Sequence, residues 1–139
     1  MKNLWLVLLS VVVFSLNSCT EDELTGGFVF GEIFDLEFGA EKTSDDGVLA
    51  VSFAEIQDSR CPLNVVCVWE GQAEVKLSVK VSGEEPVALE LINRVGYPEL
   101  GIDTLGNYIF TLEDVLPYPE DPEDLDNMDY VLKMKVEEL

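Results

Sequence analysis

Three cysteines carry most of the chemistry that this sequence could perform: Cys19, Cys61 and Cys67. Five residues separate Cys61 from Cys67, and this spacing suits a tight disulfide. The chain-entropy model gives such a bond roughly 2.4 kcal/mol for a closed loop of about seven residues. The spacing is not the Cys-x-x-Cys of redox helices, and a zinc site needs four ligands in a chain that has no histidine. A copper(I) site would need methionine as well, and Met128 and Met134 lie far along the chain.

Catalytic groups other than carboxylates are scarce. Without histidine, neither a Ser-His-Asp nor a Cys-His site can form, and no Ser-x-x-Lys motif occurs. Two carboxylates could act as acid and base in glycoside cleavage. With 28 Asp and Glu residues, however, spacing selects no pair. We therefore expect a protein that is not an enzyme and needs no cofactor.

The cysteine pair lies in the segment 58–73, which we expect to join two β-strands. Pro62 restricts one φ angle inside the ring. Residues 63–68 are apolar at all positions but one, so we expect the ring to pack onto the core, with Trp69 buried beside the sulfurs. Arg60 needs partners for its guanidinium. The candidates are the carboxylates of Asp58 and Glu70 and the face of Trp69.

A spaced pattern of seven residues runs through this loop: Arg60, Cys61, Pro62, Cys67, Trp69, Gly71 and Ala73. The pattern resembles the Arg-Cys-Pro…Cys-x-Trp-x-Gly-x-Ala signature of a family of small, functionally uncharacterised bacterial lipoproteins and secreted proteins. The resemblance is specific over about sixteen residues and looser over the rest of the chain. It implies an extracytoplasmic β-domain and carries over no catalytic residue.

The first 18 residues predict a lipoprotein signal peptide. Residues 1–3 form a short positive start, and residues 4–16 are apolar apart from two serines, which is too short a stretch to span a bilayer comfortably. The segment 16–19 then resembles a lipobox, whose cysteine receives a diacylglyceryl thioether and becomes the first residue after cleavage. Cys19 is therefore the expected lipidation site. The alternatives are ordinary secretion with a free Cys19 and a buried first helix.

Lipidation of Cys19 would leave an even number of cysteines for one disulfide, and export supplies the oxidising compartment that this bond needs. We expect residues 19–27 to be the lipidated cysteine and an acidic tether, on the extracytoplasmic side of the outer membrane. The acidic run 20–23 resembles a surface-export signal of some Gram-negative lipoproteins, or it is simply a solvated spacer. Which face of the membrane carries the protein stays open.

The charge of the chain excludes one class of partner. Eight Lys and Arg residues stand against 28 Asp and Glu residues, for a net charge of −20. Such a surface repels nucleic acid and anionic head groups. It is compatible with cations, with basic partners, or with an envelope or extracellular protein.

Polar and apolar residues alternate along several segments, which predicts β-strands. The clearest is Ala73–Val81, and Ser82-Gly83 turns it into a hairpin. Further strands are expected at 34–38, 49–53, 87–91, 108–112 and 130–136, with a short one at 28–30. Ile56 is out of phase with residues 49–53, so we expect a bulge near Ala54 and Glu55. Residues 28–139 should form a single all-β domain: an antiparallel sandwich of six or seven strands, of which an immunoglobulin-like arrangement is one form, or alternatively a small barrel.

Two irregular stretches, 93–107 and 117–129, predict long loops, which is where binding residues usually lie on a sandwich. Tyr97 and Tyr118 are the candidate binding residues, although each could instead cover the end of a sheet. The second stretch is acidic, and its carboxylates could hold Ca²⁺, although they match no EF-hand spacing. The candidate calcium ligands are Asp121, Asp124, Asp126 and Asp129. The other interpretation of this run is a solvated loop.

Three functional hypotheses follow. The first is a membrane-anchored, non-catalytic binding or accessory module of the cell envelope. The second is an inhibitor of a protease or an immunity-like protein, which exposed loops permit but no reactive-site motif supports. The third is a structural role in the envelope. Calcium binding is a minor fourth alternative.

Overall fold

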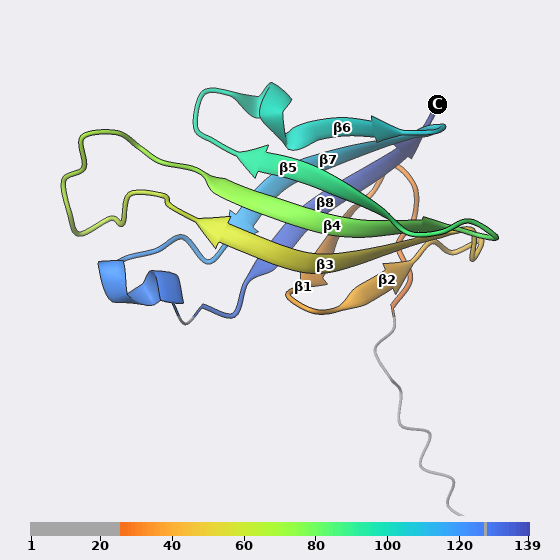
Figure 1. Cartoon of the computed structure of the whole chain (residues 1–139), viewed down its shortest axis with the longest axis horizontal. Helices are drawn as coiled ribbons and strands as arrows, with labels where there is room; N and C mark the ends of the chain where they lie inside the picture. Colours follow the sequence, from red (N-terminus) through yellow and green to blue (C-terminus); the bar gives the residue numbers. More distant parts are fainter. Residues whose placement is uncertain (1–25, 127) are drawn as a thin grey trace, which may run out of the picture.

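Alternating apolar residues produce eight strands in two antiparallel sheets of four in the computed structural model, which describes residues 26–126 and 128–139 (Figure 1). The strands are β1 (Ile33–Glu37), β2 (Glu41–Thr43), β3 (Leu49–Asp58), β4 (Ala73–Val81), β5 (Val87–Asn93), β6 (Ile102–Leu105), β7 (Tyr108–Leu116) and β8 (Val131–Glu138). Two short 3-10 helices complete the elements: η1 (Pro98–Gly101) and η2 (Pro122–Asp126). The predicted signal peptide, Cys19 and the tether up to residue 25 lie outside the described residues. No helix in the described ranges is long and apolar enough to cross a membrane.

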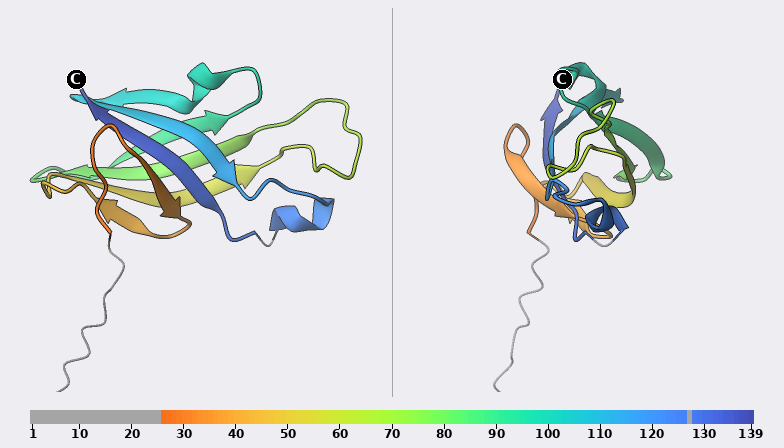
Figure 2. Two further views of the ribbon diagram at one scale, coloured as in Figure 1. Left: turned by 180° about the vertical axis from the view of Figure 1, so that it is seen from behind. Right: turned by 90° about the vertical axis from the view of Figure 1, so that its left-hand side faces the viewer.

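The sheets have the strand orders β1-β8-β7-β6 and β2-β3-β4-β5. They face each other as two layers, as the end-on view in Figure 2 shows. Within each sheet, neighbouring strands follow one another in the chain, except for β1 beside β8. The chain passes from one sheet to the other between β1 and β2 and between β5 and β6, where no hydrogen-bonded ladder forms. This confirms the sandwich rather than the closed barrel. The order is a meander, unlike the immunoglobulin arrangement, in which strands A, B, E and D share one sheet and C, F and G the other.

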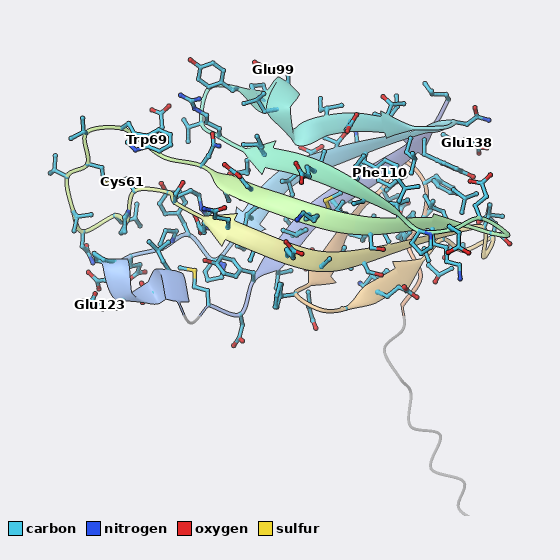
Figure 3. All side chains as sticks on the ribbon, in the orientation of Figure 1. Cys61, Trp69, Glu99, Phe110, Glu123 and Glu138 are labelled. Carbon is cyan, nitrogen blue, oxygen red and sulfur yellow. A yellow bond between two sulfur atoms is a disulfide. The ribbon has the colours of Figure 1, made fainter. Side chains whose placement is uncertain are left out.

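The core lies between the sheets and is lined by the inward-facing side chain of every second residue. The largest fully buried side chains are Phe28, Phe53, Phe110, Leu36, Leu49, Leu77, Leu91, Leu132, Met134, Val51, Val75 and Val79. Figure 3 shows Phe110 of β7 within this layer. The alternation predicted for Ala73–Val81 is confirmed up to Val79, and Val81 is half-buried.

Two bulges change the phase of the buried side chains. In β3 the register with β4 shifts between Phe53 and Glu55, so that Ile56 returns to the face that packs against the core. The bulge predicted from the phase of Ile56 is therefore confirmed. A second shift, between Leu112 and Asp114 in β7, brings Val115 into the core and was not predicted from the sequence.

Some strand predictions were wrong. The described residues form eight strands rather than six or seven, because β2 and β6 were not predicted. β6 lies inside the stretch 93–107 that was predicted to be irregular. Both are short strands at a sheet edge with almost no buried side chain, so they lack the apolar alternation that reveals a strand. Residues 28–30 form no strand, since Phe28 makes only an isolated bridge with Ser44. Phe38 lies beyond the end of β1 and is exposed.

Candidate binding surface at the loop end

The three longest connections between strands lie together at one end of the sandwich, on the left in Figure 1 and on the right in the first view of Figure 2. They are the β3–β4 connection (59–72), the β5–β6 connection with η1, and the β7–β8 connection with η2. We call this end of the molecule the loop end. The short hairpin turns at 44–48, 82–86 and 106–107 lie at the opposite end.

The β3–β4 connection begins as a continuation of the two strands. The Ser59 amide donates to the Gln72 carbonyl and the Cys61 amide to the Glu70 carbonyl, each at 2.8 Å. Gly71 lies between these bonds with φ +70°, and a Cβ atom there would lie 1.8 Å from the Ser59 carbonyl oxygen. Only glycine therefore fits at this position, which gives a physical reason for Gly71 in the motif.

Cys61 and Cys67 form the expected disulfide, with their Cα atoms 5.9 Å apart. The bond closes a ring beyond the last backbone pair of the strands, and in Figure 3 the β3–β4 connection extends outward past the labelled Cys61. Cys61 is partly buried and Cys67 is exposed. The ring therefore holds the tip of the connection in one shape without being part of the core.

Arg60 lies beneath the ring and is buried. Its Nε and Nη2 atoms form a bidentate pair with the Asp58 carboxylate, at distances of 2.6–3.0 Å. Nη1 donates to the Val115 carbonyl at 2.7 Å and Nη2 to the Pro117 carbonyl at 3.0 Å. Arg60 therefore joins the end of β3 in one sheet to the end of β7 in the other.

Two tyrosines complete the surroundings of this ion pair. The Tyr130 hydroxyl donates to Asp58 Oδ2 at 3.2 Å. The guanidinium of Arg60 lies over the Tyr118 ring, 4.8 Å from its centroid, and the Tyr118 hydroxyl donates to the Cys61 carbonyl at 3.1 Å. Of the three partners predicted for Arg60, the structure selects Asp58. We refer to Asp58, Arg60, Tyr118 and Tyr130 as the Arg60 cluster.

The first half of the disulfide ring docks on the β7–β8 connection. The Leu63 amide donates to the Pro119 carbonyl at 3.1 Å, and the Asn64 amide to the Glu120 carbonyl at 2.9 Å. The Asn64 side-chain amide also donates to Asp121 Oδ1 at 3.1 Å. Two connections far apart in the sequence are thus fixed against each other by backbone and side-chain hydrogen bonds.

The apolar side chains of the ring and of the two residues that follow it contradict the expectation of burial. They are exposed: Leu63 by 68%, Val66 by 103%, Val68 by 105% and Trp69 by 55%. The reason is geometric. The Arg60 cluster already closes the end of the sandwich, and a ring of this size projects beyond it and cannot fold back onto the core. We call Leu63, Val66, Val68 and Trp69 the apolar tip.

Trp69 has a partner that was not predicted from the sequence. Arg94, at the start of the β5–β6 connection, places its guanidinium 4.4 Å from the centroid of the Tyr97 ring and 5.9 Å from that of Trp69. Its Nε atom lies 3.7 Å from Glu70 Oε1, which is an ion pair too long for a hydrogen bond. That Nε is buried and has no hydrogen-bond acceptor among the residues that the structure describes. One available signal was that Arg94 and Arg60 are the only arginines in this acidic chain.

The structure places the two candidate tyrosines in different environments. Tyr97 is exposed beside Arg94 and lines a hollow of about 650 Å³ between η1 and the outer face of β7 and β8, which Lys135 also lines. Tyr118 is half-buried, and both its ring and its hydroxyl are engaged by the Arg60 cluster and Cys61. Tyr97 is therefore available to a partner, whereas Tyr118 holds the loops together.

The side chains of three candidate calcium ligands, Asp121, Asp124 and Asp129, are described by the structure. Asp124 Oδ2 accepts from the amides of Glu120 and Asp121, at 3.0 and 2.9 Å, and thereby shapes the loop before η2. The side chain of Asp126 lies outside what the structure describes, and Asp129 is exposed. Across the described side chains, no group of three or more acidic or cysteine residues could hold a metal ion.

Comparisons of the chain with protein-family models, with curated proteins and with solved structures found no match.

Proposed function

We propose that this chain is a lipid-anchored, non-catalytic binding module of the bacterial cell envelope, held on the extracytoplasmic side of the outer membrane, and that it binds a protein through its loop end. The absence of histidine from the whole sequence supports a non-catalytic role. The lipobox-like segment before Cys19 and the disulfide between Cys61 and Cys67 support an exported, lipidated protein.

The observation that carries the binding role is an exposed apolar surface on a rigid support. Soluble domains seldom expose neighbouring large apolar side chains unless these meet a partner. Val66 and Val68 are fully exposed, while the Arg60 cluster beneath them is buried and hydrogen-bonded. Binding would therefore require little ordering of the chain, which favours affinity.

The start of the domain is placed so that a tether leaves the loop end free. The Phe28 amide donates to the Thr43 carbonyl, and the Asp45 amide donates to the Phe28 carbonyl, each at 3.0 Å. These bonds hold Phe28 beside the 44–48 turn, at the opposite end of the sandwich (Figure 1). A lipid joined to the chain before Phe28 would therefore not cover the loop end.

The other hypotheses differ from this proposal in what they predict. An inhibitor or immunity-like protein is a special case in which the partner is an enzyme or a toxin. A structural envelope protein would need no partner at the loop end. Calcium binding receives no support from Asp121 and Asp124, whose carboxylates already accept hydrogen bonds within the loops.

The anchor is tested by intact mass. The full chain and its Cys19→Ala variant would be expressed in a Gram-negative bacterium and purified from membranes. The wild type should begin at Cys19, carry the mass of the lipid and lack the two hydrogens lost on forming the disulfide. A soluble wild-type product without fatty acid, or free thiols at Cys61 and Cys67, would refute the anchored, oxidised form.

The binding role is tested by photo-crosslinking in cells. A benzophenone amino acid would replace Trp69 or Tyr97 at the loop end and, as the control, Val87, which is exposed near the opposite end. Discrete adducts with one envelope or extracellular protein are expected from the two loop-end positions and not from Val87. Equal adducts from all three positions, or none, would contradict a partner at the loop end.

A further inference from the structure

The apolar tip is convex. Val66 and Val68 are as exposed as side chains of an extended chain, and Leu63 and Trp69 flank them with more than half of their surface exposed. In Figure 3, Trp69 lies on the limb of the β3–β4 connection that returns toward β4, and the connection extends outward beyond it. A concave surface removes more of a convex apolar projection from water than a flat surface does, so its shape points to a cleft.

The backbone of the tip is set in advance. The disulfide closes the ring, the Leu63 and Asn64 amides bind the β7–β8 connection, and Gly71 fixes the neck. Preorganised loops lose little conformational entropy on binding. A fixed backbone that exposes apolar side chains is suited to insertion into another protein.

Acidic side chains surround the tip. Glu70 follows Trp69 directly, and Glu120 and Asp121 lie on the segment that binds Asn64. Glu123 of η2 lies beside the same part of the ring in Figure 3. All four are exposed. Such a border attracts a basic surface and repels anionic head groups or a second copy of this chain, whose net charge is −20.

We infer that the apolar tip inserts into an apolar cleft of a basic secreted protein whose Lys and Arg residues meet the acidic border. The inference rests on the proposed binding role and names the chemistry of the partner. Val66 and Val68 enter the cleft, Trp69 closes one side, and the carboxylates of Glu70, Glu120 and Glu123 set orientation and association rate.

The test uses purified secreted hydrolases with open substrate clefts as probes, one set strongly basic and one strongly acidic. Binding to the immobilised oxidised domain would be measured by surface plasmon resonance. At least one basic probe should bind and no acidic probe should. Val66→Asp should weaken that binding by about tenfold or more. The matched control is Val87→Asp, the same change at an exposed valine far from the tip, and it should leave the affinity unchanged.

Charge is tested separately. Raising the salt concentration, or the double change Glu120→Gln and Glu123→Gln, should lower the association rate more than it raises the dissociation rate. Melting curves of each variant would confirm folding, since all the changed side chains are exposed.

Four outcomes would overturn the inference. The first two are no binding by any basic probe, and binding that is indifferent to Val66→Asp. The third is association with neutral phosphatidylcholine vesicles that Val66→Asp abolishes, which would assign the tip to a lipid surface. The fourth is a dimer in sedimentation that the same change dissociates. If cross-linking finds a partner at the loop end but Val66→Asp does not weaken its binding, the proposed binding role is retained. Only the inference that the apolar tip inserts into a cleft is then refuted.

Discussion

The two arginines of the chain occupy similar surroundings with different consequences. Each stacks on a tyrosine and each pairs with a carboxylate, Arg60 with Tyr118 and Asp58, Arg94 with Tyr97 and Glu70. The Arg60 side chain is 4% exposed, while that of Arg94 is 30% exposed. Arg60 has an acceptor for each of its three nitrogens, whereas the Nε of Arg94 has none.

The difference separates an arginine that stabilises the fold from one that lies on the proposed binding surface. A buried charge must be fully paired, and breaking such a pair leaves an uncompensated partner. Arg60 therefore belongs to the frame that joins the two sheets. A partly exposed pair contributes little to stability. The pair of Arg94 with Glu70 therefore contributes little to holding the fold together.

The largest expected effect is that of Arg60→Ala. It should lower the free energy of unfolding by about 3–5 kcal/mol, because Asp58 would remain as a buried charge without its partner. Urea denaturation followed by circular dichroism measures this. The matched control is Arg94→Ala, which should cost less than about 1 kcal/mol. If both variants lose the same free energy of unfolding, the two arginines do not differ in their contribution to stability.

Gly71→Ala should have the next largest effect, about 2–4 kcal/mol, because the new methyl group would meet the Ser59 carbonyl in the neck beside Arg60. Gly83→Ala is the control. Gly83 has a similar φ of +82°, but nothing lies within 4 Å of the added atom, so only the backbone cost of about 1–2 kcal/mol remains. The same urea titration compares them, and a Gly83 variant as unstable as the Gly71 variant would show that the close approach does not matter.

Replacing both cysteines of the ring by serine should lower the free energy of unfolding by about 2 kcal/mol. The reason is that the disulfide no longer restricts the conformational entropy of the unfolded chain by closing a short ring. The fold should persist, because the Arg60 cluster and the strands do not depend on the bond. Adding a reductant to the wild type should lower its melting temperature by a similar amount and leave the variant unchanged. A variant that fails to fold would show that the ring, and not only Arg60, holds the loop end.

The smallest effect is expected at the opposite end, at Asp46. The Ser44 hydroxyl and the Val48 amide donate to its carboxylate and lower the pKa of Asp46. Because the pKa of Asp46 is lower in the folded than in the unfolded chain, the ionised carboxylate stabilises the fold at pH values above the ordinary aspartate pKa of about 4. This stabilisation is lost as the pH falls through the folded-state pKa. The stability difference between wild type and Asp46→Asn should therefore shrink in acid. Urea curves at several pH values test this, and a difference independent of pH would contradict it.

Local patterns in the sequence predict the interior of the sandwich well. Alternation identifies β4 and most of β3, β7 and β8, and the phase of Ile56 predicts the bulge in β3. The spacing of Cys61 and Cys67 predicts their bond. These features depend on residues close together in the chain, for which side-chain period and loop length are sufficient.

The sequence by itself therefore determined the fold class, the bulge and the disulfide. Only the tertiary structure decided how the loop end is built. Arg60 meets Val115, Pro117 and Tyr118, which lie more than fifty positions away, and no local period encodes such contacts. The apolar run 63–68 is exposed because hydrophobic residues are buried only where the chain can reach the core, and here the Arg60 cluster closes the core before the ring begins.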